Sequence, residues 1–370
     1  SNNQLFNPKG VDLMVHYRVY ARNDLQYIDG GVVKDYSIDY DIISNNTSSA
    51  SIIDTSKGFK GDIIALIDGS SLVELGVITA IDNTDHKISF KQMKELFNDS
   101  IINVFKYTDL LKCKFDGVHG LKTILNYAFI QTTDVQKRLP LEIRTFGSDT
   151  NCVYADEDDT INLADFIDWL FDTYNIYLDF SINFFTNKIV CMIAKNSTEG
   201  YVIKDNIKLS KPEFDSNDMP TYNKVVFYDE TTGQEKGTYY LLDTNELTTD
   251  YTNEHRVQPT QTKFVKWDET QAIKEGYTME QQAKSELCGN IFNHCILYKL
   301  AKNQTMVKSK NFKYGDKVTI VYKDREYQSI FTGLKYTMNE PYYTCVFGKT
   351  RIDFTDRMKI YNDRRYKKRR

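Results

Sequence analysis

Two stretches near the ends of the chain share one order of apolar runs and turns. In the first, apolar residues fill 63–67, 72–81 and 87–90, separated by turns rich in Asp, Gly and Asn. Short β-rich runs bounded by such turn residues predict a three-stranded antiparallel meander. The second stretch has the same order, with alternating apolar positions from Val318 to Phe347. Both ends of the chain are therefore predicted to be β.

A Gly-Asp pair stands before each meander, in "FKGDIIALID" at 59–68 and in "FKYGDKVTIVY" at 312–322. Gly accepts positive φ, and Asp can accept hydrogen bonds from nearby backbone amides. We therefore predict that Gly61-Asp62 and Gly315-Asp316 form tight corners, each leading into the first strand of its meander.

The long middle run of each meander contains one glycine, Gly76 in the first and Gly333 in the second. A glycine inside a strand marks a bulge or the bend of a barrel. We interpret the two stretches as a degenerate duplication of one small β-barrel. The alternative is that two unrelated meanders converged on a common pattern.

Between the two predicted barrels the period of the apolar residues changes. Residues 162–174 hold the i, i+3, i+4, i+7 spacing of an amphipathic helix, and Asn162 is a suitable N-cap. A shorter helical stripe covers 121–129, and two strands are expected around 176–180 and 188–194. This part of the chain is predicted to be a mixed α+β insert.

Further along, residues 222–243 predict a hairpin with a long turn, followed by a long loop at 244–262. Thr278 and Gln281 form a capping box that opens a helix with Ala283 and Leu287 facing inward. A strand is expected at 294–300, just before the second meander.

The predicted fold class is multi-domain α+β and mainly β, with two similar small barrels at the ends. An α+β insert and a hairpin domain lie between them. The predicted domains are a first barrel at 1–112, the α+β insert at 113–205, the hairpin domain and its connection at 206–265, a helix plus second barrel at 266–352, and a basic tail at 353–370.

Composition narrows the possible classes of protein. The chain has 370 residues, 41% of them hydrophobic, and a net charge of −4, so it can build large cores and presents no overall field for nucleic acid or membranes. Its six cysteines lie far apart without a Cys-x-x-Cys pair, which argues against a disulfide framework or zinc cluster. No signal peptide or apolar run of membrane-spanning length is found. The 26 Tyr and 21 Phe favour a protein with large interfaces.

No catalytic, cofactor-binding or metal-binding constellation emerges from the sequence. Nucleotide-binding loops, zinc-protease motifs and nucleophile elbows are absent. Acidic residues at 156–159 are expected to favour the start of the following helix. On that helix Asp165, Asp168 and Asp172 share a polar face, which we predict to be solvated, with a docking surface as the alternative. Cys288 and Cys295 are expected to be core residues.

The chain ends in a block of positive charge, "DRRYKKRR" at 363–370. We predict that this block is an assembly contact whose binding weakens with salt, and the alternative is a frayed end. The residues expected to make the contact are Arg364, Arg365, Lys367, Lys368, Arg369 and Arg370.

The order of elements over 11–352 resembles the baseplate hub proteins of tailed bacteriophages. The similarity is carried by "YNKVVFYDETT" at 222–232, "TMEQQAKSEL" at 278–287 and "FKYGDKVTIVYKDREYQSIFTGLKY" at 312–336. The sequence looks like the short tail-associated hubs of siphophages that infect Gram-positive bacteria. These are related in fold to the contractile-tail hub and to the base of the type VI secretion spike.

The resemblance implies a structural protein of the virion, made in the bacterial cytoplasm and working without a cofactor. It implies a homotrimer in which six similar barrels match a hexameric ring of the distal tail protein. The trimer would cap the tail tube and open to let DNA pass without specific binding. The tape measure protein and the receptor-binding proteins of the baseplate are the other expected partners. Longer relatives continue into a wall-degrading domain, but this chain is expected to lack one.

Two other classes of function stay open. A receptor-binding or carbohydrate-binding tail module could also be multi-domain and rich in tyrosine. It would gather exposed aromatic side chains in one pocket. A cell-wall hydrolase would need a convergent pair of carboxylates in the 113–262 region.

Overall fold

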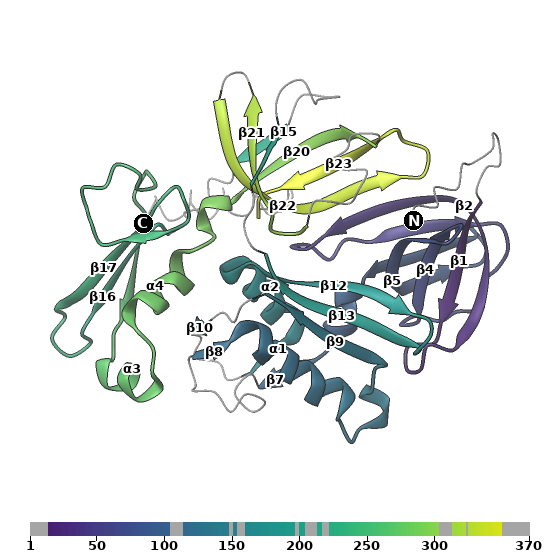
Figure 1. Cartoon of the computed structure of the whole chain (residues 1–370), viewed down its shortest axis with the longest axis horizontal. Helices are drawn as coiled ribbons and strands as arrows, with labels where there is room; N and C mark the ends of the chain where they lie inside the picture. Colours follow the sequence, from purple (N-terminus) through teal and green to yellow (C-terminus); the bar gives the residue numbers. More distant parts are fainter. Residues whose placement is uncertain are drawn as a thin grey trace, which may run out of the picture.

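The computed structural model describes residues 14–103, 114–147, 151–153, 160–196, 200–203, 213–216, 222–302, 313–322 and 325–349. Strands dominate, and the helices belong to the central part of the chain, as Figure 1 shows. The multi-domain, mainly β α+β fold class is therefore confirmed. The ranges predicted for the individual domains stay predictions.

Six strands near the N-terminus form a closed barrel. They are β1 (Val15–Tyr20), β2 (Tyr27–Asp41), β3 (Ser48–Ile52), β4 (Ile63–Asp68), β5 (Ser71–Asp82) and β6 (Lys87–Gln92). The order around the barrel is β1-β4-β5-β6-β3-β2, and it closes because β1 also pairs with β2. Tyr17, Ile64 and Phe90 fill the interior. The outward-facing Ile63 and Ala65 are buried as well, because they pack against the insert.

The insert places a three-stranded sheet against two helices. The short helix η1 (Met93–Phe97) follows the last barrel strand and leads to the insert. The elements of the insert are β7 (Ile101–Asn103), β8 (Lys114–Asp116), α1 (Gly117–Leu125), the π-helical turn η3 (Asn126–Ile130), η4 (Val135–Lys137), β9 (Leu141–Phe146), β10 (Asn151–Val153), β11 (Thr160–Asn162), α2 (Leu163–Tyr174), β12 (Ile176–Asn183) and β13 (Lys188–Lys195). In the sheet β13 runs antiparallel to β12 and parallel to β9. The Asn162 side chain accepts a hydrogen bond from the Ala164 amide, so the predicted N-cap of α2 is correct.

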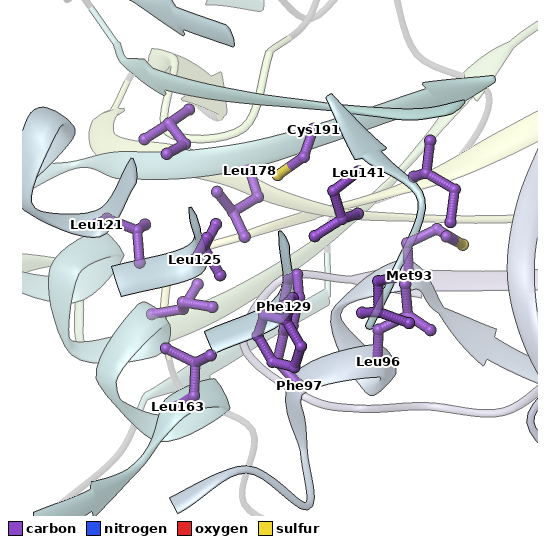
Figure 2. Packing of buried hydrophobic residues seen from close by; sticks show 14 of the residues in the cluster. Met93, Leu96, Phe97, Leu121, Leu125, Phe129, Leu141, Leu163, Leu178 and Cys191 are labelled. Carbon is purple, nitrogen blue, oxygen red and sulfur yellow. The ribbon is translucent and has the colours of Figure 1, made fainter. Parts of the chain in front are cut away.

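One hydrophobic core joins the insert to the first barrel. In Figure 2, side chains from α1, α2 and the sheet meet those of η1, and the rings of Phe97 and Phe129 lie 5.1 Å apart. This cluster also takes in Ile63 and Leu75 from the outside of the barrel. The insert is thus fixed to the first barrel by apolar packing.

A four-stranded sheet with two helices stands apart from the first barrel in Figure 1. It contains β16 (Lys224–Tyr228), β17 (Glu235–Leu241), β18 (Leu247–Thr248), β19 (Thr262–Lys266), α3 (Glu269–Glu275) and α4 (Met279–Leu287). The capping box of Thr278 and Gln281 is formed, and both Ala283 and Leu287 are fully buried. They pack on Val225 and Leu241, so α4 contacts this sheet although the sequence analysis grouped it with the second barrel.

The remaining strands form the second β unit. They are β14 (Tyr201–Ile203), β15 (Glu213–Ser216), β20 (His294–Ala301), β21 (Lys317–Tyr322), β22 (Arg325–Thr337) and β23 (Tyr342–Phe347), with η6 (Asn290–Phe292) before β20. Their order is β15-β20-β23-β22-β21-β14. The hydrophobic core of this second unit includes Tyr298, Ile320 and Phe347. The long strands β2 and β22 pair with each other, which joins both units into one sheet.

Candidate functional site

The first Gly-Asp pair forms a corner held by four hydrogen bonds. The Phe59 amide donates to Asp62 Oδ2 at 2.8 Å, and the Asp62 amide donates to the Phe59 carbonyl at 3.1 Å. Across the sheet, the Gly61 amide donates to the Ile78 carbonyl and the Ile78 amide donates to the Asp62 carbonyl, both at 2.8 Å. Gly61 has φ of +97°, which favours glycine.

The second pair forms the same corner. The Lys313 amide donates to Asp316 Oδ2 at 2.7 Å, and the Asp316 amide donates to the Lys313 carbonyl at 3.0 Å. The Gly315 amide donates to the Phe331 carbonyl at 2.8 Å, and the Phe331 amide donates to the Asp316 carbonyl at 2.9 Å. Gly315 has φ of +81°. Four matching bonds make Asp62 equivalent to Asp316 in the two units.

This equivalence pairs Gly61-Asp62 with Gly315-Asp316 and leaves the two Phe-Lys pairs out of step. Lys313, and not Phe312, occupies the place of Phe59, so the two Phe-Lys pairs are shifted by one residue. The corner is defined by main-chain bonds and by one carboxylate, and its other side chains are free to differ.

The match continues into the middle strands. The pairing of β5 with β6 shifts register between Ile78 and Ala80, and that of β22 with β23 shifts between Phe331 and Gly333. The bulged residue is a threonine in both units, Thr79 and Thr332. Each threonine directly follows the residue that bonds to the corner, Ile78 or Phe331. The sequence analysis missed this signal.

The two strand glycines are not equivalent. Gly333 lies two residues after Phe331 at the bulge, whereas Gly76 lies two residues before Ile78. A Cβ on Gly76 would come within 2.6 Å of the Lys91 carbonyl oxygen, so close approach explains this glycine. The expectation of a bulge is met at Gly333 alone.

The corners differ in what covers them. Asn175, the left-handed C-cap of α2, donates from Nδ2 to the Gly315 carbonyl at 2.9 Å. Asn196 Nδ2 donates to Asp316 Oδ1 at 2.6 Å, and Asp316 is buried. In the first unit no atom lies within 4 Å of a Cβ built on Gly61. The second corner is therefore docked on the insert, while the first is open.

Helix α2 is tied to both β units by two buried lysines. Lys94, beside the first barrel, donates to Asp168 Oδ1 at 2.6 Å and to the Ile42 carbonyl at 3.1 Å. Lys349, after the last strand of the second unit, lies 3.0 Å from Asp172 Oδ1. The expectation that this helical face is solvated holds for Asp172, whose side chain is 54% exposed, and fails for Asp168, whose carboxylate pairs with the buried Lys94.

The pKa of the Asp168 carboxyl group is shifted from its usual value. Burial raises its pKa to about 6, and the opposing attraction of Lys94 only partly offsets that burial. The third aspartate on the helix, Asp165, is exposed. The polar face of α2 therefore contacts other parts of the same chain at two positions four residues apart, Asp168 and Asp172.

A cleft of about 300 Å³ opens where the first barrel, the insert and the second unit meet. Aromatic rings dominate its lining. The ring of Tyr314 stacks on Tyr40 at 5.1 Å and on Phe331 at 5.4 Å. Burial raises the pKa of Tyr40 and of Tyr314 far above the usual range, with Glu74 adding to both shifts. Because the rings stack on one another, they act first as packing between units.

The residues with nucleophilic or basic side chains have ordinary structural surroundings. His294 Nε2 lies 2.7 Å from Ser329 Oγ, but Ser329 is buried. Cys288 and Cys295 are partly buried rather than fully in the core, and burial raises the pKa of Cys288 to about 11. Within the part of the chain that the structure describes, no group of three or more His, Cys, Asp or Glu could hold a metal ion.

Two features of the sequence analysis lie outside the described residues. These are the acidic cluster at 156–159 and the basic block from Arg364 to Arg370. Over the residues that are described, no helix is long and apolar enough to cross a membrane.

No protein-family model matches the sequence, and no curated protein matches it significantly. Among solved structures, the prophage tail protein gp18 from Listeria monocytogenes aligns with a TM-score of 0.52 and 11% identity, over 93% of this chain and 97% of that chain. The 43 kDa tail protein of prophage MuSo2 from Shewanella oneidensis aligns with a TM-score of 0.51 and 9% identity, over 91% and 96%. The chain has the fold of a phage tail protein.

A chain of the phage P2 baseplate in its activated conformation with Ca also aligns, with a TM-score of 0.49 and 13% identity over 91% of this chain and 99% of that one. The tail proteins from Listeria monocytogenes and Shewanella oneidensis share the fold of this chain at 11% and 9% identity, so few residues are common to them. Roles of single residues in this chain must therefore come from its own geometry, above all from the two corners and the joint of β2 with β22.

Proposed function

We propose that this chain is the structural hub of a phage tail tip or baseplate and works as a homotrimer. Three copies would present six similar β units in a ring, which fits a hexameric tail tube on one face and three-fold components on the other. The observation that carries the proposal is the equivalence of the two hydrogen-bonded corners within one chain.

In the virion this hub would cap the tail tube below the distal tail protein, contact the tape measure protein, and open for DNA when the phage attaches. The insert, which packs on the first barrel and is tied to both units through Lys94 and Lys349, would be the part that closes the tube. The hub would have no enzymatic step of its own.

The test is the assembly state of the purified protein, alone and mixed with the distal tail protein of the same phage. Native mass spectrometry should give a trimer, and negative-stain images should show a ring with six lobes that stacks on a distal tail protein ring. A protein that stays monomeric at micromolar concentration, alone and in the mixture, would contradict the proposal.

A carbohydrate-binding tail module is the second candidate, and the aromatic cleft is the feature that favours it. Sugar recognition needs an aromatic face that is free to stack on the ring of the sugar. Tyr314 has its neighbours Tyr40 and Phe331 stacked on it, which favours the hub. Binding of host-wall oligosaccharides with loss on Tyr177→Ala, measured by titration calorimetry, would support the module instead.

A further inference from the structure

We propose that the outer edge of β5 at Ile81–Asp82 is the surface on which a second copy of this chain packs, through residues 215–216 on the outer edge of its β15. The inference rests on the proposed trimer and names the strands that would join its copies. It follows from a joint that already exists inside one chain, between β2 and β22.

That internal joint is an antiparallel strand pair with additional contacts. Residues 37–41 of β2 lie opposite 333–337 of β22, directly after the bulge of the second unit. The Ile42 amide donates to the Thr332 carbonyl at 2.9 Å, and Lys335 forms an ion pair with Asp39 at 3.0 Å. One unit therefore binds the other through the part of its middle strand that follows the bulge.

In the first unit no described strand lies beside the equivalent segment. Since Ile78 is equivalent to Phe331 and Thr79 to Thr332, residues 80–82 correspond to 333–335. Their inner edge pairs with β6, while β4 pairs with β5 only as far as Val77. Among the described residues no strand pairs with the outer edge of 79–82.

The counterpart of β2 is β15. Ser49 of β3 lies opposite Ser89, as Leu297 of β20 lies opposite Val346, so the two residues are equivalent. Their partners on the next strand are Ser37 of β2 and Glu213 of β15. Whereas β2 pairs with β22 on its other side, β15 has no described strand there.

Among the described residues, two unpaired strand edges therefore match the two strands of the internal joint. An unpaired edge is a template for adding a strand from another chain. Pairing β5 of one copy with β15 of the next is a head-to-tail contact, which closes into a ring when the rotation is 120°. Phe59, at the open corner bonded to Ile78, is 73% exposed and would be covered by the same contact.

The register of the joint also predicts which positions meet. Position 82 of one copy would lie opposite position 215 of the next, the places that Lys335 and Asp39 hold inside one chain.

Proximity cross-linking tests the predicted pairing. A chain with both Asp82→Cys and Asp215→Cys, treated with a short bis-maleimide, should give covalent dimers and trimers on a denaturing gel. Each single variant should stay at its background level, as should the matched pair Ile273→Cys with Asp215→Cys, because Ile273 is 75% exposed on α3. The native cysteines are the same in all four proteins.

A second measurement keeps the test independent of cross-linking. Phe59→Glu should raise the concentration at which the trimer half-dissociates by ~10-fold or more, because a buried Phe contributes roughly 1.5–3 kcal/mol. The control Ile273→Glu should leave that concentration unchanged. A trimer by native mass spectrometry that neither cross-links through 82 and 215 nor responds to Phe59→Glu overturns this inference and leaves the proposed hub intact. A chain that is monomeric throughout overturns both.

Discussion

Replacing each corner glycine by alanine measures two contributions to stability separately, the cost of backbone strain and the value of the contact with the insert. Both glycines have positive φ, where a Cβ costs roughly 1–2 kcal/mol. At Gly61 that is the whole cost, since nothing lies within 4 Å of the new methyl group. We therefore expect Gly61→Ala to lower the free energy of unfolding by about 1–2 kcal/mol.

At Gly315 the same methyl group would overlap the side chain of Asn175. Asn175 then has to move, and its hydrogen bond to the Gly315 carbonyl is lost. An unpaired buried polar group costs roughly 1–3 kcal/mol. Gly315→Ala should therefore cost about 2–5 kcal/mol in total, by adding this penalty to the strain measured at Gly61.

Urea denaturation followed by tryptophan fluorescence measures both costs, and hydrogen exchange over 163–174 reports α2 locally in case unfolding is not two-state. Asn175→Gly keeps the left-handed C-cap of α2 but removes the overlapping side chain. Combined with Gly315→Ala it should cost less than the sum of the single variants. If Gly315→Ala proves no more costly than Gly61→Ala, the second corner is not docked as described.

The remaining predictions concern acidity, thiols and the end of the chain. The pKa of Asp168 is raised to about 6 in the folded protein, compared with about 4 in the unfolded chain. The contribution of Asp168 to stability is therefore full below about pH 4 and is lost as the pH rises through about 6. Asp168→Asn should remove this pH dependence from the free energy of unfolding, measured by urea titration at about pH 4–7. The buried thiols of Cys191 and Cys345 should react with Ellman's reagent only after unfolding, and fast reaction in the native protein would contradict their burial. Truncation after Tyr361 removes the basic block, and phage tails carrying the truncated chain should fall apart even at low salt. If such particles assemble, survive high salt and infect normally, the basic block is only a frayed end.

Local patterns in the sequence were enough to predict most single elements. The stripe of α2 with its Asn162 cap and the box of Thr278 and Gln281 appear where they were expected. These signals involve residues three or four positions apart, so the chain itself carries the geometry. The strands of both meanders follow for the same reason, because alternation and turn residues are local.

What joins the elements was decided by the tertiary structure. Asp168 meets Lys94 across 74 positions and Asp172 meets Lys349 across 177, and nothing local marks either pair. The equivalence of Thr79 with Thr332 was also out of reach, because a bulge is set by pairing with a neighbouring strand and leaves the side chains around it free to vary. Sequence similarity fades at such positions while backbone hydrogen bonding persists, so only the folded chain revealed that Gly76 and Gly333 do not correspond.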